Sequence, residues 1–251
     1  MSENRQPAMT QRERKDIGLV PLPEETFLRL TVNGRALGQL SCSPFNFEEL
    51  AVGWLFHQGI IDELPEIEGY RVDASRACVQ IWLTATASER LDGYTPVHIS
   101  ACAGGTANAK LYDDLAPVRR DYELDLERLR ALMRQIFDRE TLFHEHGGIH
   151  CSMLADMKKE MILVSREDIG RGNTVDKVTG WGLFNGIDLR ETALFTTGRI
   201  SSEMAIKAHR ARIATIVSLT TFTSKAYEIA VKTGMTLAGH LLKPRPILIH
   251  F

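Results

Sequence analysis

The sequence predicts an α/β protein with a smaller α+β unit in its N-terminal part. Three observations lead to this fold class. Residues 19–39 alternate apolar and polar side chains around Asn33-Gly34, which is typical of a β-hairpin. Residues 126–137 carry apolar side chains at helical spacing. From residue 149 onward, short apolar runs alternate with helical segments, which indicates a largely parallel or mixed sheet covered by helices.

The N-terminal hairpin is followed by a predicted helix and a further strand. Ser43-Pro44 ends the second strand of the hairpin. Asn46 is the expected N-cap of the helix, which runs to about Gln58 and carries acidic residues near its positive N-terminal end. Gly59 stops this helix, and residues 77–84 are expected to form a strand.

The second half contains repeated strand and helix units. Asp125 is the expected N-cap of the helix at 126–137, and Gly234 is the expected C-cap of the last helix. The other expected elements are strands at 149–156 and 161–166, a helix at 175–184, a strand at 193–197, a helix at 201–212, a strand at 213–219, a helix at 223–233 and a strand at 236–238.

These elements divide the chain into three expected parts. Residues 1–18 are polar and charged without an apolar core, so we expect a disordered tail. Residues 19–118 form the predicted small α+β domain, which includes a Gly/Ala-rich loop around Cys102. Residues 119–251 form the predicted α/β domain.

Composition limits the setting and the partners of the protein. Its 251 residues, 44% hydrophobic and 25% charged, are ordinary for a soluble globular protein. A net charge of −2 gives no general reason to expect a nucleic-acid partner, and no apolar run reaches the ~20 residues that span a membrane. The four cysteines form no Cys-x-x-Cys pair. We therefore expect a reducing, cytoplasmic setting.

Three strand-to-helix junctions offer groups that bind anions. They span residues 170–173, 196–202 and 218–224, and the first two contain Arg171 and Arg199. In a parallel sheet all three would lie along the carboxyl edge of the strands, where helix N-terminal amides and hydroxyls favour a phosphate-bearing ligand. Ordinary helix capping by Ser and Thr is the alternative explanation.

Cys102 is the candidate nucleophile of the chain. It lies in the small, uncharged segment 100–107, where a thiolate could carry sulfur as a persulfide. The alternative is an inert small residue in a loop. Cys42 and Cys78 fall in predicted strands, where a core role is expected.

Two further polar segments have competing interpretations. The cluster at 143–151 contains three histidines and Cys151, but it has no supporting cysteine pair, and Gly147-Gly148 interrupts regular geometry, so we expect no metal site. A polar turn or a ligand-contact segment is expected instead. The run at 239–246 places Lys243 and Arg245 beside two prolines, which suits either a solvated loop or a rigid phosphate clamp.

Taken together, these motifs resemble the FdhD family, the sulfurtransferase accessory proteins of formate dehydrogenases. The segments that carry the resemblance are residues 32–34, 43–44, 49–55 and 59–61 in the N-terminal half, and 147–150, 166–173, 176–177, 198–203 and Lys207 in the C-terminal half. The resemblance covers residues 19–251.

The resemblance implies a role in maturing a molybdenum or tungsten enzyme. Family members take persulfide sulfur from a cysteine desulfurase and pass it to the metal of the bis-guanine-dinucleotide cofactor, a transient ligand, before insertion into the formate dehydrogenase catalytic subunit. The family implies a homodimer and a C-terminal cytidine-deaminase-like three-layer domain with a mixed sheet. Its motifs place Cys102 as catalytic residue, and as cofactor-binding residues His150, Asp168, Gly170, Arg171, Asn173, Asp176, Lys177, Gly198, Arg199, Ser201, His240, Lys243 and Arg245.

The chain departs from the family pattern at two places. The family's Cys-Gly-x-Cys-Gly loop corresponds here to residues 102–106, where Gly105 replaces the second cysteine and Ala103 and Thr106 replace the glycines. A single thiol can still hold a persulfide, but an internal disulfide at this motif cannot form. Gly172 stands where the family usually carries histidine.

Two functions therefore remain open from the sequence. The first is a sulfurtransferase that carries a persulfide on Cys102. The second is a cofactor-binding chaperone without sulfur transfer, which the missing second cysteine allows. A zinc deaminase is disfavoured because neither its His-x-Glu nor its Pro-Cys-x-x-Cys motif occurs.

Overall fold

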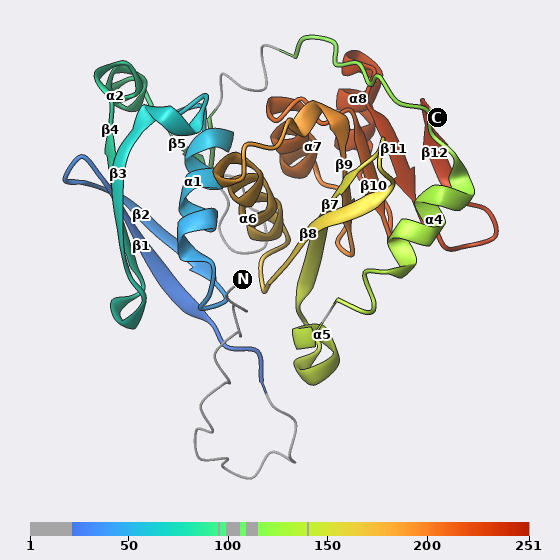
Figure 1. Ribbon diagram of the computed structural model, residues 1–251, viewed down its shortest axis with the longest axis horizontal. Coiled ribbons are helices and arrows are strands. Elements are labelled where there is room, and N and C mark those ends of the chain that lie inside the picture. Colours follow the sequence, from blue (N-terminus) through green and yellow to red (C-terminus); the bar gives the residue numbers. More distant parts are fainter. Residues whose placement is uncertain (1–21, 95, 99–105, 109–114, 140, 251) are drawn as a thin grey trace.

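The computed structural model describes residues 22–94, 96–98, 106–108, 115–139 and 141–250 (Figure 1). The predicted tail at 1–18 and the predicted catalytic residue Cys102 lie outside the described residues.

The N-terminal unit is a four-stranded sheet with one face covered by a helix. The hairpin turn at Asn33-Gly34 is confirmed, with positive φ angles of 48° and 77° that match a two-residue β-turn. The strands are arranged in the order β2-β1-β4-β3, and β1 and β4 run parallel. The elements of this unit are β1 (Thr26–Val32), β2 (Arg35–Cys42), α1 (Phe47–His57), η1 (Leu64–Glu66), β3 (Ile67–Asp73), η2 (Ala74–Arg76), β4 (Cys78–Leu83) and α2 (Ala85–Asp92).

A short hairpin and two helices connect the two sheets. Asp125 caps α4 as predicted, because its side chain accepts a hydrogen bond from the backbone N–H of Arg128. The connecting elements are β5 (Pro96–His98), β6 (Thr106–Asn108), α4 (Leu126–Arg134) and α5 (Thr141–His146).

The C-terminal unit is a six-stranded mixed sheet in the order β12-β11-β10-β9-β7-β8. Strands β9, β10 and β11 are parallel, while β7 pairs antiparallel with both β9 and β8. The elements are β7 (His150–Asp156), β8 (Met161–Asp168), α6 (Arg171–Phe184), η3 (Leu189–Glu191), β9 (Thr192–Thr196), α7 (Ser202–Arg210), β10 (Thr215–Ser218), α8 (Ser224–Thr233), β11 (Thr236–Gly239) and β12 (Ile247–Ile249).

Helices cover both faces of the C-terminal sheet, which gives three layers (Figure 1). Leu129 and Met133 of α4 pack with Met153 and Phe195 against one face. The other face belongs to a larger core that also contains side chains of α6, α7 and α8 and of the N-terminal unit. The mixed α/β fold class is thereby confirmed. The likeness to cytidine deaminases and the domain boundary near residue 118 stay predictions.

Helices α1 and α6 join the two units by a glycine-mediated crossing. A Cβ atom added at Gly53 would lie 1.9 Å from the carbonyl oxygen of Asp176, and one added at Gly180 would lie 2.0 Å from that of Glu49. Neither position accepts a side chain unless the helices separate. The crossing brings α1 of the N-terminal unit directly against the helix that follows the predicted anion-binding turn.

Two predicted details differ in the structure. Helix α6 starts at Arg171 rather than 175, with Gly170 as N-cap. Asn46 does occupy the N-cap position of α1, but its backbone is left-handed and its side chain makes no capping hydrogen bond. Among the described residues, no helix combines the length and the apolar character needed to cross a membrane.

Candidate functional site

The predicted anion-binding junctions lie along one edge of the C-terminal sheet. Strands β8, β9, β10 and β11 point the same way, because β7 is antiparallel to both β8 and β9. The carboxyl ends of these four strands therefore share an edge with the first residue of β7, His150. We call this edge, with the loops at residues 147–150, 168–174, 196–202, 218–224 and 239–245, the loop edge.

Backbone hydrogen bonds tie the neighbouring loops of the loop edge to one another. The N–H of Thr197 donates to the carbonyl of Cys151 at 3.0 Å, and the N–H of Ile200 donates to the carbonyl of Thr221 at 2.9 Å. The hydroxyl of Ser218 donates to the carbonyl of Gly198 at 2.8 Å. The N–H of His240 donates to the carbonyl of Thr220. The loops therefore form a connected surface rather than independent turns.

Arg171, His150 and Gly198 come together at the centre of the loop edge. A Cβ atom added at Gly198 would lie 3.1 Å from Cβ of Arg171 and 3.4 Å from Nδ1 of His150, so only a small residue leaves space for both side chains. Nε of Arg171 is buried, and no described residue accepts a hydrogen bond from it. A buried guanidinium donor without a partner is costly, and an anion at this place would satisfy it.

The surroundings of His150 favour its neutral form. Its burial and the neighbouring Arg171 lower its pKa, and Arg199 acts in the same direction. A neutral imidazole can both donate and accept a hydrogen bond. His150 can therefore contact a polar ligand atom without adding a charge.

The remaining predicted contacts surround this centre. Ser201 is the N-cap of α7, and its side chain accepts a hydrogen bond from the N–H of Met204. Arg199 is exposed, and His240 is half-buried with a left-handed backbone. Lys243 and Arg245 are exposed in the connection from β11 to β12, three strands along the sheet from β7. The structure gives no contact that joins these last two residues to Arg171.

Asp168 and Lys177, both predicted to bind the ligand, are fully buried and bind each other. Nζ of Lys177 lies 2.7 Å from Oδ2 of Asp168 and 4.5 Å from the centre of the Phe45 ring. The carboxylate of Asp168 also accepts hydrogen bonds from the backbone N–H groups of Ser43 and Gly170, at 3.1 and 2.8 Å. These two charges hold the turn before α6 against the N-terminal unit.

Asp176 of α6, also predicted to bind the ligand, belongs to a second buried cluster of charged side chains. Oδ1 of Asp176 lies 2.6 Å from Nδ1 of His57, and Oδ2 lies 2.7 Å from Nζ of Lys207. Glu203 lies 3.2 Å from the same ammonium group. Burial alone would lower the pKa of Lys207, but Asp176 and Glu203 outweigh it and raise this pKa. Burial lowers the pKa of His57, so its neutral ring donates from Nδ1 to Asp176.

Asn173 and Gly172 show how the turn is fixed in place. The side-chain amide of Asn173 donates to the carbonyl of Ser41 at 2.7 Å and to Asp168 at 2.8 Å. A Cβ atom at Gly172 would lie 2.9 Å from Oε1 of Glu203, so the glycine leaves room for the buried cluster. Asn173 thus positions the turn through β2, although it was predicted as a ligand contact.

The roles of His57, Glu203 and Lys207 were not predicted from the sequence. The composition of α6 could have indicated that its charged residues need such buried partners. This helix is buried over most of its length and contains Gly180 and Gly182, so its few charged side chains needed buried partners on neighbouring helices.

The three cysteines that the structure describes differ in exposure. Cys42 and Cys151 are buried, and Cys78 is half-exposed. Burial and the nearby charge of Asp168 raise the pKa of Cys42 to about 12, so this thiol is a poor nucleophile. No group of three or more His, Cys, Asp or Glu side chains within the described ranges has the arrangement of a metal site.

The class of protein that the fold and site define is a mixed α/β protein whose sheet edge gathers arginines, a histidine and glycine-containing turns. A sequence model of the FdhD/NarQ family matches residues 23–248, and the chain belongs to this family.

Individual relatives agree with the family assignment. The chain is 29% identical over 217 residues to the sulfur carrier protein FdhD of Geobacillus kaustophilus, covering 85% of this chain and 82% of the relative. It is 30% identical over 215 residues to the sulfur carrier protein FdhD of Bacillus subtilis, covering 84% and 81%. A crystal structure from Desulfotalea psychrophila, described as that of a formate dehydrogenase accessory protein, superposes with a TM-score of 0.74 at 26% identity, covering 90% of this chain and 87% of that one.

Proposed function

We propose that this chain is a sulfur carrier of the formate dehydrogenase system, acting as a sulfurtransferase. Cys102 accepts persulfide sulfur from a cysteine desulfurase and passes it to the molybdenum or tungsten bis-guanine-dinucleotide cofactor, which is then inserted into the formate dehydrogenase catalytic subunit. Two curated relatives named sulfur carrier proteins and a structural neighbour described as a formate dehydrogenase accessory protein support this role. The proposal places the protein in the cytoplasm as a homodimer.

The observation that carries the proposal is the convergence of Arg171, His150 and Gly198 at the loop edge. The buried Nε of Arg171, which has no hydrogen-bond partner among the described residues, suits a phosphate oxygen of a guanine dinucleotide. Arg199, Lys243 and Arg245 supply further positive charge for the phosphates, and His150, Ser201 and His240 supply hydrogen bonds.

Buried residues of the predicted site take positioning roles in this proposal. Asp168 pairs with Lys177, and Asp176 pairs with Lys207. The side-chain amide of Asn173 donates a hydrogen bond to Asp168. They fix the position of Gly170 and Arg171 relative to α7. The cofactor phosphates are then contacted by the exposed or half-buried cations.

The sulfur-accepting step conserves atoms and electrons. The thiolate of Cys102 attacks the terminal sulfur of the desulfurase persulfide, the sulfur–sulfur bond of the donor breaks, and the donor leaves as a thiolate. Delivery of the terminal sulfur to the metal as sulfide takes up two electrons, which a thiol reductant supplies.

Substitution of Cys102 by Ala tests the proposal. We expect the variant to bind guanosine diphosphate with unchanged affinity but to yield formate dehydrogenase without activity in cells that lack their own copy of the gene. Full formate dehydrogenase activity with Cys102→Ala would instead support the cofactor-binding chaperone. Cys78→Ser serves as the matched control, because Cys78 lies on the N-terminal sheet, away from the loop edge.

A further inference from the structure

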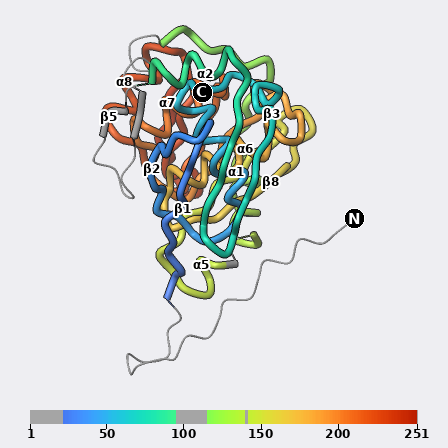
Figure 2. Tube along the Cα trace, turned by 90° about the vertical axis from the view of Figure 1, so that its left-hand side faces the viewer, coloured from blue at the N-terminus to red at the C-terminus, as the bar shows by residue number. Residues whose placement is uncertain are grey.

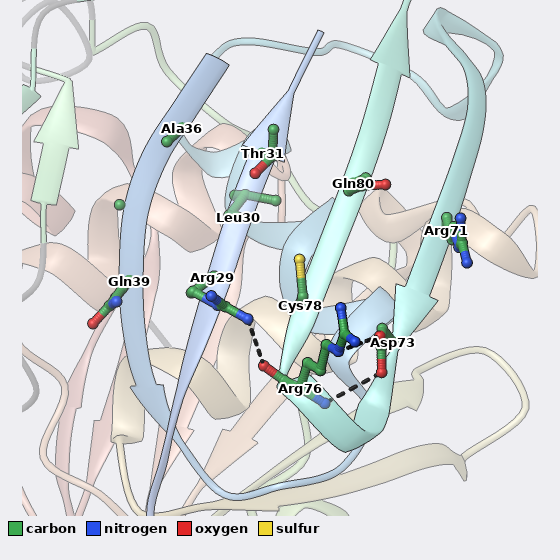
Figure 3. Close-up of a pocket in the computed structure, with 11 residues that line it drawn as sticks. Arg29, Leu30, Thr31, Ala36, Gln39, Arg71, Asp73, Arg76, Cys78 and Gln80 are labelled. Carbon is green, nitrogen blue, oxygen red and sulfur yellow. Dashed lines mark hydrogen bonds and ion pairs between the residues drawn. The ribbon is translucent and has the colours of Figure 1, made fainter. Parts of the chain in front are cut away.

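The outer face of the N-terminal sheet carries a groove that the proposed function does not use (Figure 3). Register pairs Arg29 with Cys78 across β1 and β4, and pairs Arg71 with Gln80 across β3 and β4, so these side chains share one face. The groove has a volume of about 580 Å³, and its lining includes Arg29, Gln39, Arg71, Arg76, Cys78 and Gln80.

No helix among the described residues covers this face. In Figure 1 helix α1 lies on the opposite side of the sheet, between it and α6, and Figure 2 looks onto the outer face with β1 and β3 in front. Phe27 is 59% exposed and Trp82 45% exposed on the same side of the sheet. The groove is therefore separated from the loop edge by the layer of α1 and α6.

The charge of the groove is positive, although the whole chain carries −2. Arg29, Arg71 and Arg76 line it together with one carboxylate, that of Asp73. Arg76 lies 3.6 Å from Asp73, and this carboxylate offsets one of the three arginines, so the lining keeps a net charge of +2, three positive charges minus one. Arg29 donates one hydrogen bond to the carbonyl of Arg76 at 3.3 Å.

We propose that this face docks an acidic polypeptide segment of a partner protein. Arginine guanidinium groups bind carboxylates in a bidentate manner, and three of them along one groove fit several Asp or Glu side chains. The amides of Gln39 and Gln80 can pair with the backbone of the segment. This surface is additional to the proposed cofactor site and uses none of its residues.

Other occupants fit the groove less well. The net negative charge of the chain opposes a nucleic acid. A second copy of the chain placed on this face by twofold symmetry would bring arginines against arginines.

Fluorescence anisotropy of the full chain with labelled peptides tests the proposal. The probe is a fluorescein-labelled decapeptide of alternating Glu and Ser, with a Gln/Ser decapeptide as its uncharged control and a thymidine decanucleotide as a second polyanion. The test variant combines Arg29→Gln, Arg71→Gln and Arg76→Gln. The control variant combines Arg119→Gln, Arg134→Gln and Arg139→Gln, which are exposed elsewhere and change the net charge equally.

The half-exposed thiol of Cys78 gives an independent readout of where the peptide binds. We expect the Glu/Ser peptide to slow alkylation of Cys78 by iodoacetamide several-fold, measured by peptide mapping. We expect the groove variant to lose affinity by about tenfold or more, since each charged contact contributes modestly, and the control variant to change by less than about twofold.

Four results would overturn the proposal. They are no binding of the Glu/Ser peptide at low salt, equal affinity losses in the groove and control variants, binding without protection of Cys78, and tighter binding of the thymidine decanucleotide than of the peptide. Sedimentation of both variants adds a fifth: a dimer that only the groove variant dissociates would assign this face to a second copy.

Discussion

Arg171 and Lys177 lie on the same helix, yet the structure gives them different tasks. Arg171 is half-buried at the loop edge, and its Nε has no partner within the described ranges, while Lys177 is fully buried and paired with Asp168. The sequence presented both as cations near a glycine turn. Only the packing of Phe45 and Ser43 from the N-terminal unit against this turn distinguishes them.

Replacement of Arg171 by Gln is therefore expected to weaken ligand binding and leave the fold intact. We expect the affinity for guanosine diphosphate, measured by calorimetry, to fall by about ten- to a hundredfold, the loss of one charge-assisted contact. Arg134→Gln, an exposed change on α4, is the control. An unchanged affinity in Arg171→Gln would show that Arg171 does not contact the ligand.

Lys177→Met should instead lower the free energy of unfolding by about 3–5 kcal/mol, because it leaves Asp168 buried without its partner.

His57 makes stability depend on pH. Its pKa is lowered by burial, so the unfolded chain binds a proton more readily than the folded chain. The stabilising contribution is therefore complete above the unfolded pKa of about 6.5 and is lost as the pH falls below it, by at most about 1.4 kcal/mol per pH unit.

Urea unfolding between about pH 7.5 and pH 5.5 checks this sign. Asn at position 57 keeps a donor near the place of Nδ1 without titrating. We expect His57→Asn to show a shallower fall of unfolding free energy with decreasing pH than the unsubstituted chain. His150→Asn replaces the other described histidine whose pKa is lowered, and it should also flatten the slope. A slope that His57→Asn leaves unchanged would show that other groups dominate.

At the scale of elements, the crossing of α1 and α6 depends on two glycines. Because added Cβ atoms at Gly53 and Gly180 would meet backbone carbonyls, which cannot rotate away, Gly53→Ala and Gly180→Ala should force the helices apart. We expect each to lower the unfolding free energy by about 2–3 kcal/mol or more. Gly93→Ala is the matched control, since its Cβ would lie 3.8 Å from the nearest atoms, and it should be neutral. Equal effects at the three positions would contradict the close crossing.

Elements with strong local signals were predicted well. The hairpin turn, the Asp125 cap of α4 and the left-handed Gly234 at the end of α8 all agree with the structure, because turn and cap chemistry is local. Elements without such signals were missed. Strand β3 is an edge strand without apolar alternation, α2 buries only Ala87 and Leu91, α5 is six residues long, and β5, β6 and β12 are three residues long each.

For the site, the sequence predicted which edge of the sheet carries the loops, but it did not predict which of the site residues are buried. Register brings the predicted turns together, as expected for strands that point the same way. The buried carboxylate of Asp176 has its partners far away in the sequence: His57 lies 119 residues earlier in the chain, and Lys207 lies on the next helix. Such distant partners leave no mark in the spacing of residues around the turn.

Viewed as a whole, the described residues form two hydrophobic core clusters, and the larger one runs through both units. It joins Leu28 and Leu55 of the N-terminal unit to Val178 and Ile216 of the C-terminal unit. Polar contacts also cross between them, including the pair of Arg166 with Glu49, at 2.5 Å. The two sheets therefore share the larger cluster, and the domain boundary near residue 118 stays a prediction.

A shared core predicts one cooperative unfolding transition. We expect urea curves followed by far-ultraviolet circular dichroism and by tryptophan fluorescence to coincide, with Trp54 and Trp181 reporting on α1 and α6. Gly93→Ala provides a folded reference for the same curves. Two separated transitions would indicate that the sheets unfold independently.

The central claim, that Cys102 carries sulfur, is tested most directly by mass spectrometry after incubation of the pure protein with a cysteine desulfurase and cysteine. The account predicts a reductant-labile addition of one sulfur atom on Cys102, present in Cys78→Ser and absent in Cys102→Ala. No sulfur on Cys102, with the desulfurase active on another acceptor, would contradict the account and favour a cofactor-binding chaperone.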